Sequence, residues 1–202
     1  MIDAHPHTTL ALIRHGQARA PDASYGAATP LSPLGRRQAA RVVATLGQRP
    51  RPAAVYTSPF PRAVQTAAPL GRAYAIAPLI DPRLAEFELG CGALDAVVER
   101  PDLLIWRPEH QGVAGGEPLR AFAARIAAFC DAVVARHVGG WVAVVTHAGT
   151  IDAALRWAVG CRPRAPGSTS SISPPPPSPN WRSGPTAACR WGATLHHNPA
   201  GG

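Results

Sequence analysis

Near its N-terminus the chain reads Thr9-Leu10-Ala11-Leu12-Ile13-Arg14-His15-Gly16, and this stretch decides the fold. The apolar run at its start predicts a buried strand of a parallel sheet. The strand would end in a histidine that stands between a permanent cation and a glycine, which lets a ligand approach the backbone. An imidazole in these surroundings can attack phosphorus, so the stretch indicates phosphoryl transfer through a phosphohistidine.

A second segment has the same design. Residues 141–146 form another apolar strand candidate, and His147 follows it directly, before two small residues. Two histidines that follow strands in one chain support each other as parts of a single site.

A third segment adds a cation. Residues 53–57 form a short strand candidate, followed by Ser58 and by a helix whose first turn would hold Arg62. A phosphate oxygen could meet both the guanidinium group and the N-terminus of the helix there.

The order of the predicted elements indicates the fold class. The strand candidates are residues 8–13, 53–57, 141–146 and, more weakly, 73–77, and the helix candidates are residues 33–46, 60–70, 118–136 and 150–159. Their alternation predicts an α/β three-layer sandwich, in which helices cover both faces of a mainly parallel central sheet. Ligands bind beyond the carboxyl ends of the strands in such sheets, where His15, Ser58 and His147 would fall.

Several motifs along the chain are similar to those of one family. They are Arg14-His15-Gly16, Leu31-Ser32-Pro33-Leu34-Gly35-Arg36-Arg37-Gln38-Ala39, Ser58-Pro59 with Arg62-Ala63 and Gln65-Thr66-Ala67, Leu84-Ala85-Glu86 with Gly90, Gly115-Gly116-Glu117, and Thr146-His147-Ala148-Gly149. Over roughly residues 8–160 the chain resembles the histidine phosphatase superfamily, also called phosphoglycerate-mutase-like, and within it the phosphatase branch.

The resemblance, together with the charges, implies a mechanism. His15 is expected to be the nucleophile, and Arg14 and Arg62 are expected to hold the phosphate dianion. His147 is expected to lie beside the phosphate as a charged electrostatic partner. Water would then attack the phosphohistidine, and neither a metal ion nor another cofactor is required.

Four further residues are expected near the phosphate: Gly16, Gln17, Ser58 and Ala148. Gln17 stands where many relatives carry Glu or Gln. Ser58 is expected first to orient its loop or cap the helix of Arg62, and to contact phosphate second. Pro21 departs from the family, because many members have an asparagine there that donates to phosphate.

The departing alcohol needs a proton, and Glu86 is the preferred donor. The spacing of its loop matches the acid-bearing loop of the family, and Phe87 and Leu89 could desolvate the carboxyl group. Glu88 is the alternative donor. Glu117 is expected only to complement the N-terminal dipole of the following helix.

The same loop favours hydrolysis over phosphoryl migration. The family's mutases carry Glu-Arg-His-Tyr-Gly, and this chain has Glu86-Phe87-Glu88-Leu89-Gly90, which lacks the positive charge that would bind a second acidic group. The chain is therefore interpreted as a phosphatase that acts on a small-molecule phosphate ester. The two alternatives are a cofactor-dependent phosphoglycerate-type mutase and a catalytically weak module that binds a phospho-ligand. The sequence does not identify the substrate.

The composition argues against several other classes of partner and site. All 20 basic residues are arginine and are spread along the chain, so the net charge of +8 does not predict a nucleic-acid partner. Four widely separated cysteines, Cys91, Cys130, Cys161 and Cys189, favour neither a metal site nor a redox motif. The first apolar run is too short for a signal peptide or a membrane span, so no membrane partner and a cytoplasmic location are expected. The oligomeric state is open, with a homodimer as one option.

One catalytic domain is expected. Residues 1–162 would form the histidine phosphatase core. Residues 163–185, rich in Pro and Ser, predict a disordered linker or loop, in preference to a ligand for a proline-binding module. Residues 186–202 would form a tail, with a possible terminal strand at residues 190–195.

Overall fold

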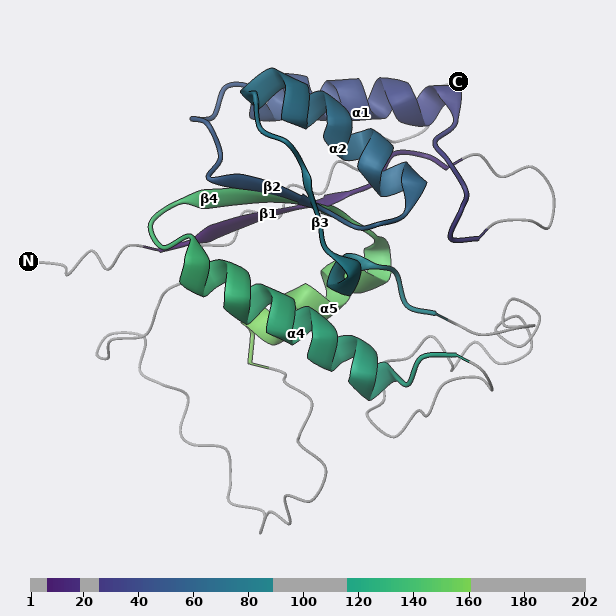
Figure 1. Cartoon of the computed structure of the whole chain (residues 1–202), viewed down its shortest axis with the longest axis vertical. Coiled ribbons are helices and arrows are strands. Elements are labelled where there is room, and N and C mark those ends of the chain that lie inside the picture. Colours follow the sequence, from purple (N-terminus) through teal and green to yellow (C-terminus); the bar gives the residue numbers. More distant parts are fainter. Residues whose placement is uncertain (1–6, 19–25, 89–115, 161–202) are drawn as a thin grey trace, which may run out of the picture.

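The computed structural model describes residues 7–18, 26–88 and 116–160, which form a four-stranded parallel sheet between two layers of helices (Figure 1). The strands are β1 (Thr9–Arg14), β2 (Ala54–Thr57), β3 (Leu79–Ile80) and β4 (Trp141–Thr146), in the order β1-β4-β2-β3. Arg14 pairs with Thr146, and Thr57 pairs with Val145. The strands β1, β2 and β4 therefore end at one edge of the sheet.

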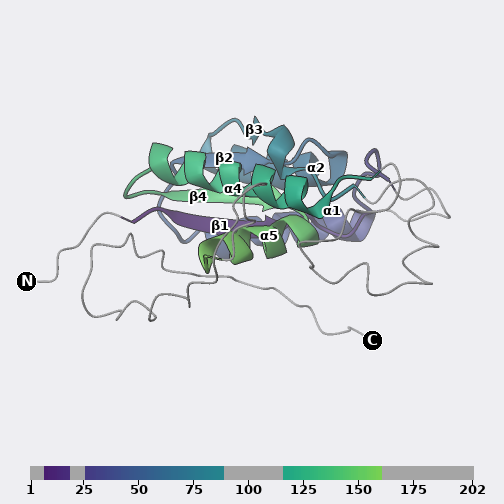
Figure 2. The same cartoon turned by 90° about the horizontal axis from the view of Figure 1, so that it is seen from below.

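Helices cover both faces of this sheet. On one face lie α1 (Pro33–Leu46) and α2 (Pro61–Tyr74), and on the other lie α4 (Leu119–Arg136) and α5 (Ala148–Ala158) (Figure 1). In the view of Figure 2, α5 lies over β1 and α4 over β4 and β2. A short 3-10 helix, η2 (Pro82–Leu84), follows β3. The α/β three-layer sandwich with a parallel sheet is confirmed.

Alternate residues of β4 contribute to the two halves of the core. Val142 and Val144 face α4 and α5 and pack in one buried cluster with Phe122, Ile126 and Phe129 of α4. Ala143 and Val145 face the opposite way and pack with Ala63, Ala67 and Leu70 of α2. Because successive side chains of a strand point to opposite faces, a strand that is buried on both sides has to be apolar throughout, as β4 is.

Local signals set several boundaries where the sequence places them. The bounds of α1 and β4 are those predicted, and α1 begins where the Ser32 hydroxyl accepts a hydrogen bond from the Gly35 N–H at 3.0 Å. The predicted bounds of β1, β2, α4 and α5 differ from the observed ones by one or two residues at an end. The helix α2 is longer than predicted and ends at Tyr74.

The weak strand expected at residues 73–77 is wrong. Its first two residues belong to α2, which ends with Ala75 in the left-handed conformation at φ 52°, and the strand at this edge is β3. The hydroxyl of Tyr74 donates to the Leu46 carbonyl, and its ring packs edge-on against Trp141. These contacts with distant parts of the chain favour helix over the local preference for a strand.

The turn after β1 passes very close to the start of α1. A Cβ atom added to Gly16 would lie 2.5 Å from the carbonyl oxygen of Gly35, and one added to Gly35 would overlap the carbonyl oxygen of Gln17. Both neighbours are backbone atoms, so neither can rotate away. The two glycines therefore allow the turn that carries His15 to lie against α1.

Replacing Gly35 by alanine is expected to lower the free energy of unfolding by about 2 kcal/mol. Alanine favours a helix by about 1 kcal/mol over glycine, but the backbone overlap at this position costs more than that gain. Urea denaturation would measure the change. Ala40→Gly, at an exposed position of α1, is the control and should lose only the helix preference. A Gly35→Ala protein as stable as the wild type would contradict the close approach.

Several predictions lie outside the described residues. They are the expectations for residues 163–185 and 186–202, for Pro21, and for Leu89 and Gly90. No helix within the described part of the chain is long and apolar enough to cross a membrane.

Candidate active site

Two histidines and a serine meet where β1, β2 and β4 end. His15 follows β1, Ser58 follows β2 and His147 follows β4, as predicted. The ring centroids of the two histidines lie 5.0 Å apart, and the Ser58 hydroxyl lies 2.7 Å from Nε2 of His147. The parallel register of the strands thus assembles residues that are far apart in the sequence.

Hydrogen bonds define the state of the His15 ring. Its Nδ1 lies 2.7 Å from the carbonyl oxygen of Gly16, and its Nε2 lies 3.3 Å from Nε of Arg62. A carbonyl oxygen only accepts and a guanidinium only donates, so this pattern fits a neutral ring with hydrogen on Nδ1 and a lone pair on Nε2.

Burial favours the neutral form of both histidines. It lowers the pKa of His15 to about 4, a shift that the charges of Arg62 and Arg14 increase and the hydrogen bond with Gly16 opposes. Burial also lowers the pKa of His147 to about 3, and His15 and nearby arginines add to this shift. The side chain of His147 is only 1% exposed, so its neutral form is favoured while no phosphate is bound, and the charge expected for it beside a phosphate stays a prediction.

Acidification is expected to destabilise the fold as the pH falls from about 6.5 towards 3. The pKa of each histidine is lower in the folded protein than in the unfolded chain, so the unfolded chain binds more protons in this range. The stabilisation is complete above pH 6.5 and decreases by about 1.4 kcal/mol per pH unit for each histidine. Urea denaturation at several pH values would measure this slope. His147→Asn should show a shallower slope, and an unchanged slope would contradict the lowered pKa.

Arg62 lies in the first turn of α2 and is 3% exposed. Besides its contact with His15, it donates from Nη1 to the carbonyl oxygen of Gly26 at 2.8 Å. Its guanidinium lies over the ring of Phe60, 4.8 Å from the centroid, and that ring packs edge-on against His147 with centroids 5.0 Å apart. Sequence reasoning missed Phe60, although its position two residues before Arg62 is a signal.

Thr66 is a second residue that sequence reasoning did not assign to the site. Its hydroxyl accepts a hydrogen bond from the Gly16 N–H at 3.1 Å and donates to the Arg62 carbonyl at 2.7 Å. The side chain thereby joins the turn of His15 to the helix of Arg62. Its spacing of four residues from Arg62 places both on one helix face, which could have identified it.

Arg14, the other arginine predicted to bind phosphate, lies at the surface of a hollow. Arg14 is exposed, and with His15, Gln17, Arg37 and Arg41 it lines a hollow of about 660 Å³. The hollow is positively charged because three of these side chains are arginines.

Gln17 is bound to the start of α1. Its side-chain oxygen accepts from the Ser32 hydroxyl at 2.6 Å, and its N–H donates to the side chain of Gln38. Ala148 is the first residue of α5 and is exposed. Gln17 thus shapes the turn, whereas Ala148 lies at a helix N-terminus beside His147.

Glu86 reaches the same edge of the sheet. Its Oε2 accepts a hydrogen bond from the N–H of Gly149, near the start of α5, at 3.1 Å, and its Oε1 accepts one from Phe87 at 2.9 Å. Glu88 is exposed, and its carbonyl oxygen accepts from Glu117 at 2.8 Å. Of the two candidate acids, Glu86 is the one whose carboxylate lies beside the segment of His147.

Glu117 has a partner that the sequence did not predict. The helix α4 begins after Pro118, and the carboxylate of Glu117 forms a two-point ion pair with Arg125, at 2.7 and 2.8 Å. The ion pair outweighs a weak interaction with the helix dipole because both groups are largely buried.

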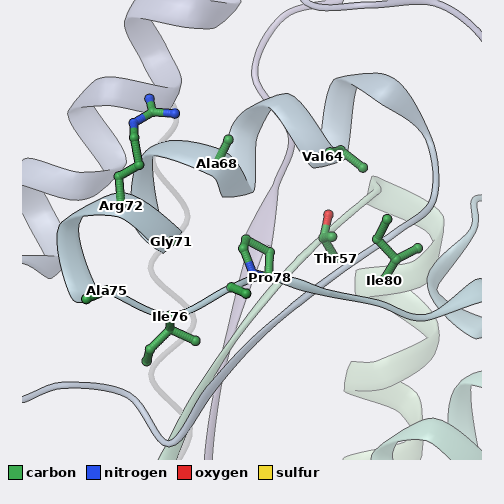
Figure 3. Close-up of a pocket in the computed structure, with 10 residues that line it drawn as sticks. Thr57, Val64, Ala68, Gly71, Arg72, Ala75, Ile76, Pro78 and Ile80 are labelled. Atoms are coloured by element: carbon green, nitrogen blue, oxygen red, sulfur yellow. The ribbon is translucent and has the colours of Figure 1, made fainter.

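A second hollow, of about 450 Å³, lies between α2 and the segment that leads into β3 (Figure 3). Its lining is mostly apolar, and Arg72 is the one ionisable side chain among the lining residues. Leu79 and Ile80 of β3, at the edge of the sheet, are 47% and 58% exposed. This hollow lacks the histidines, the serine and the glutamate that meet at the ends of the strands.

Comparison with curated proteins finds relatives in mycobacteria. The bifunctional protein Rv2228c of Mycobacterium tuberculosis is 31% identical over 161 residues, which cover 75% of this chain and 44% of the relative. The chain therefore spans less than half the length of this curated relative.

Solved structures share the fold. The mycobacterial glucosyl-3-phosphoglycerate phosphatase Rv2419c is 30% identical, with a TM-score of 0.64 over 75% of this chain and 79% of that chain. The alpha-ribazole phosphatase from Shigella flexneri, 24% identical with a TM-score of 0.63 over 75% and 79% of the two chains, shows the fold alone.

The family model of the histidine phosphatase superfamily, branch 1, matches residues 10–171. The match includes β2, β3 and β4, all of β1 except Thr9, and each of the segments that converge at the edge of the sheet. The resemblance found in the sequence is thus confirmed, and the chain belongs to branch 1 of the histidine phosphatase superfamily.

Proposed function

We propose that the protein hydrolyses phosphomonoesters through a phosphohistidine formed at Nε2 of His15. One observation carries the proposal: Nδ1 of a neutral His15 is bound to the Gly16 carbonyl, so the lone pair of Nε2 is directed towards the guanidinium of Arg62. A phosphate group held by that cation would bring its phosphorus atom to the nucleophile.

The reaction takes two balanced steps. In the first, Nε2 of His15 forms a bond to phosphorus as the ester P–O bond breaks, and protonated Glu86 gives its proton to the leaving alcohol oxygen. In the second, a water oxygen attacks phosphorus, the P–N bond breaks, and the carboxylate of Glu86 accepts the proton of the water. The sum is an ester and water going to an alcohol and inorganic phosphate.

The cations and the second histidine stabilise the transferred group. Arg62 and Arg14 would bind the phosphoryl oxygens, because their charge does not depend on pH in the working range. A bound dianion would favour the charged form of His147, in which both ring nitrogens are donors, and Ser58 would hold the ring at Nε2. Ala148 would offer its N–H from the start of α5, while Gly16 and Gln17 shape the turn around the phosphate.

The acid loop favours hydrolysis over a mutase reaction. The ring of Phe87 packs against Phe122 with centroids 5.2 Å apart, so an apolar residue occupies the position at which mutases of the family carry arginine. Similar solved structures include a mycobacterial glucosyl-3-phosphoglycerate phosphatase, which supports a small-molecule phosphate ester as substrate. We propose that the enzyme acts without a metal ion, since arginines can supply the positive charge, and that it works in the cytoplasm.

The test is hydrolysis of p-nitrophenyl phosphate, with and without a chelator, followed by trapping of the phosphoenzyme. Protein quenched at alkaline pH, where phosphohistidine persists, would be digested and analysed by mass spectrometry. We expect chelator-resistant turnover and phosphate on His15. Phosphate on another residue, or activity that requires a divalent cation, would contradict the proposed mechanism. Binding of inorganic phosphate without turnover of any ester would favour the binding-module alternative.

A further inference from the structure

The guanidinium group of Arg125, on α4, binds the backbone of the loop that carries Glu86. Arg125 donates from Nη1 to the carbonyl oxygens of Arg83 at 2.5 Å and Ala85 at 2.9 Å, and from Nη2 to that of Glu86 at 3.3 Å. Its Nε and Nη2 also donate to the two carboxylate oxygens of Glu117. All five N–H groups of the side chain therefore have acceptors.

Two threonines complete the attachment of this loop. The hydroxyl of Thr146 donates to the Leu84 carbonyl at 2.8 Å, and that of Thr150 donates to the Ala85 carbonyl at 3.2 Å. Four consecutive carbonyl groups, from residue 83 to residue 86, thus accept hydrogen bonds from α4, from the end of β4 or from α5. The backbone that leads up to Glu86, and the carbonyl group of Glu86 itself, are therefore held by neighbouring elements.

The position of Arg125 is itself determined by its neighbours. The ion pair with Glu117 is largely buried, and the guanidinium lies over the ring of Phe122, 4.6 Å from the centroid. A planar group with five donors is required here, because a lysine ammonium has three donors and cannot reach acceptors on both sides. The arrangement is therefore specific for arginine.

The carboxyl end of the Glu86 side chain is held by Gly149. The Gly149 N–H binds Oε2, and a Cβ atom at this glycine would lie 2.6 Å from Oε1. The absence of a side chain at this position lets the carboxylate approach the first turn of α5, two residues after His147.

We propose that Arg125 is a positioning residue, which holds the loop of Glu86 from behind while Gly149 locates its carboxyl group, so that the acid is oriented towards the leaving alcohol. This inference rests on the proposed function, in which Glu86 is the proton donor. Orientation of a general acid matters most when the leaving group is a poor one. The predicted effect of losing Arg125 therefore depends on the ester.

The experiment compares two esters, p-nitrophenyl phosphate, whose nitrophenolate leaves without a proton, and β-glycerophosphate, whose alkoxide needs one. For Arg125→Lys and Arg125→Met we expect kcat/KM to fall about 100-fold for β-glycerophosphate and less than about fivefold for p-nitrophenyl phosphate. Glu86→Gln should show the same contrast. Arg136→Met, an exposed position at the other end of α4, is the matched control and should change neither rate.

Gly149→Ala tests the same inference without disturbing the ion pair. Alanine favours the helix, and the group that it would displace is the end of a flexible side chain, so this variant is expected to fold. It should lose activity towards β-glycerophosphate selectively. The double variant Arg125→Lys/Glu86→Gln should lose no more kcat/KM for β-glycerophosphate, relative to p-nitrophenyl phosphate, than Glu86→Gln alone. Both substitutions affect the same proton transfer.

The outcomes separate the two proposals. Equal losses for both esters in folded Arg125 and Gly149 variants would show a merely structural role and overturn the positioning inference. Failure of the proposed function would be seen in other proteins, as hydrolysis that survives in His15→Asn or as wild-type hydrolysis that requires a divalent cation.

Discussion

Replacing His15 by asparagine is expected to lower kcat/KM for phosphomonoesters by about 10⁴-fold or more. The substitution removes the nitrogen that would form the bond to phosphorus, whereas the asparagine amide can still donate to the Gly16 carbonyl as Nδ1 of His15 does. The shape of the turn should therefore be retained and the nucleophile alone lost. Steady-state hydrolysis of p-nitrophenyl phosphate would measure the loss, and no phosphoenzyme should be trapped.

The fold of this variant can be checked independently of activity. Because burial lowers the pKa of His15 to about 4, its replacement by a neutral side chain should leave the protein folded and reduce the dependence of its stability on acid. Inorganic phosphate should still bind, since Arg62 and Arg14 are retained. A His15→Asn protein that keeps more than a small fraction of wild-type turnover would contradict the assignment of the nucleophile.

Replacing Arg62 by methionine is expected to lower kcat/KM by about 10³-fold. The variant loses the cation placed beside Nε2 of His15 and the donor to the Gly26 carbonyl. The kcat/KM of Arg62→Lys should lie between those of Arg62→Met and the wild type, because lysine keeps the charge but not the planar set of donors. Arg72→Met, on an exposed position of the same helix, is the matched control and should retain activity. A loss below about tenfold in folded Arg62→Met would contradict the role of this cation.

The Arg62 variant should also change the pH dependence. Burial is the largest cause of the lowered pKa of His15, and the charge of Arg62 lowers it further. Removing that charge lets the pKa rise from about 4 towards 6.5, so protonation inactivates the nucleophile at a higher pH. The acidic limb of kcat/KM should shift upward relative to the wild type on the same ester. A downward shift would show that Arg62 does not act on His15 through its charge.

Fold class and the main site residues followed from short-range signals. The strand β4 is apolar because both of its faces are covered, and α1 begins where Ser32 can cap it and Pro33 can start a helix. A histidine directly after each of two parallel strands has to lie at their common edge. The sequence therefore predicted that His15 and His147 meet, without any knowledge of the helices around them.

The protonation states of the histidines and the contacts that hold the loop of Glu86 could not be predicted from such short-range signals. The charge of His147 depends on how much protein covers it, and the partner of Glu117 depends on where α4 lies relative to the loop of Glu86. The strand expected at residues 73–77 failed for a similar reason, because the contacts of Tyr74 with Leu46 and Trp141 extend α2.

The sequence by itself determined the order of strands and helices, the family, and the two histidines and the arginine at the ends of the strands. These depend on periodicity, capping and motif spacing, which act between residues close in the chain. Tertiary structure alone decided that burial lowers the pKa of both histidines and that Arg125 binds the loop of Glu86. Desolvation and hydrogen bonding arise between segments that only folding brings together.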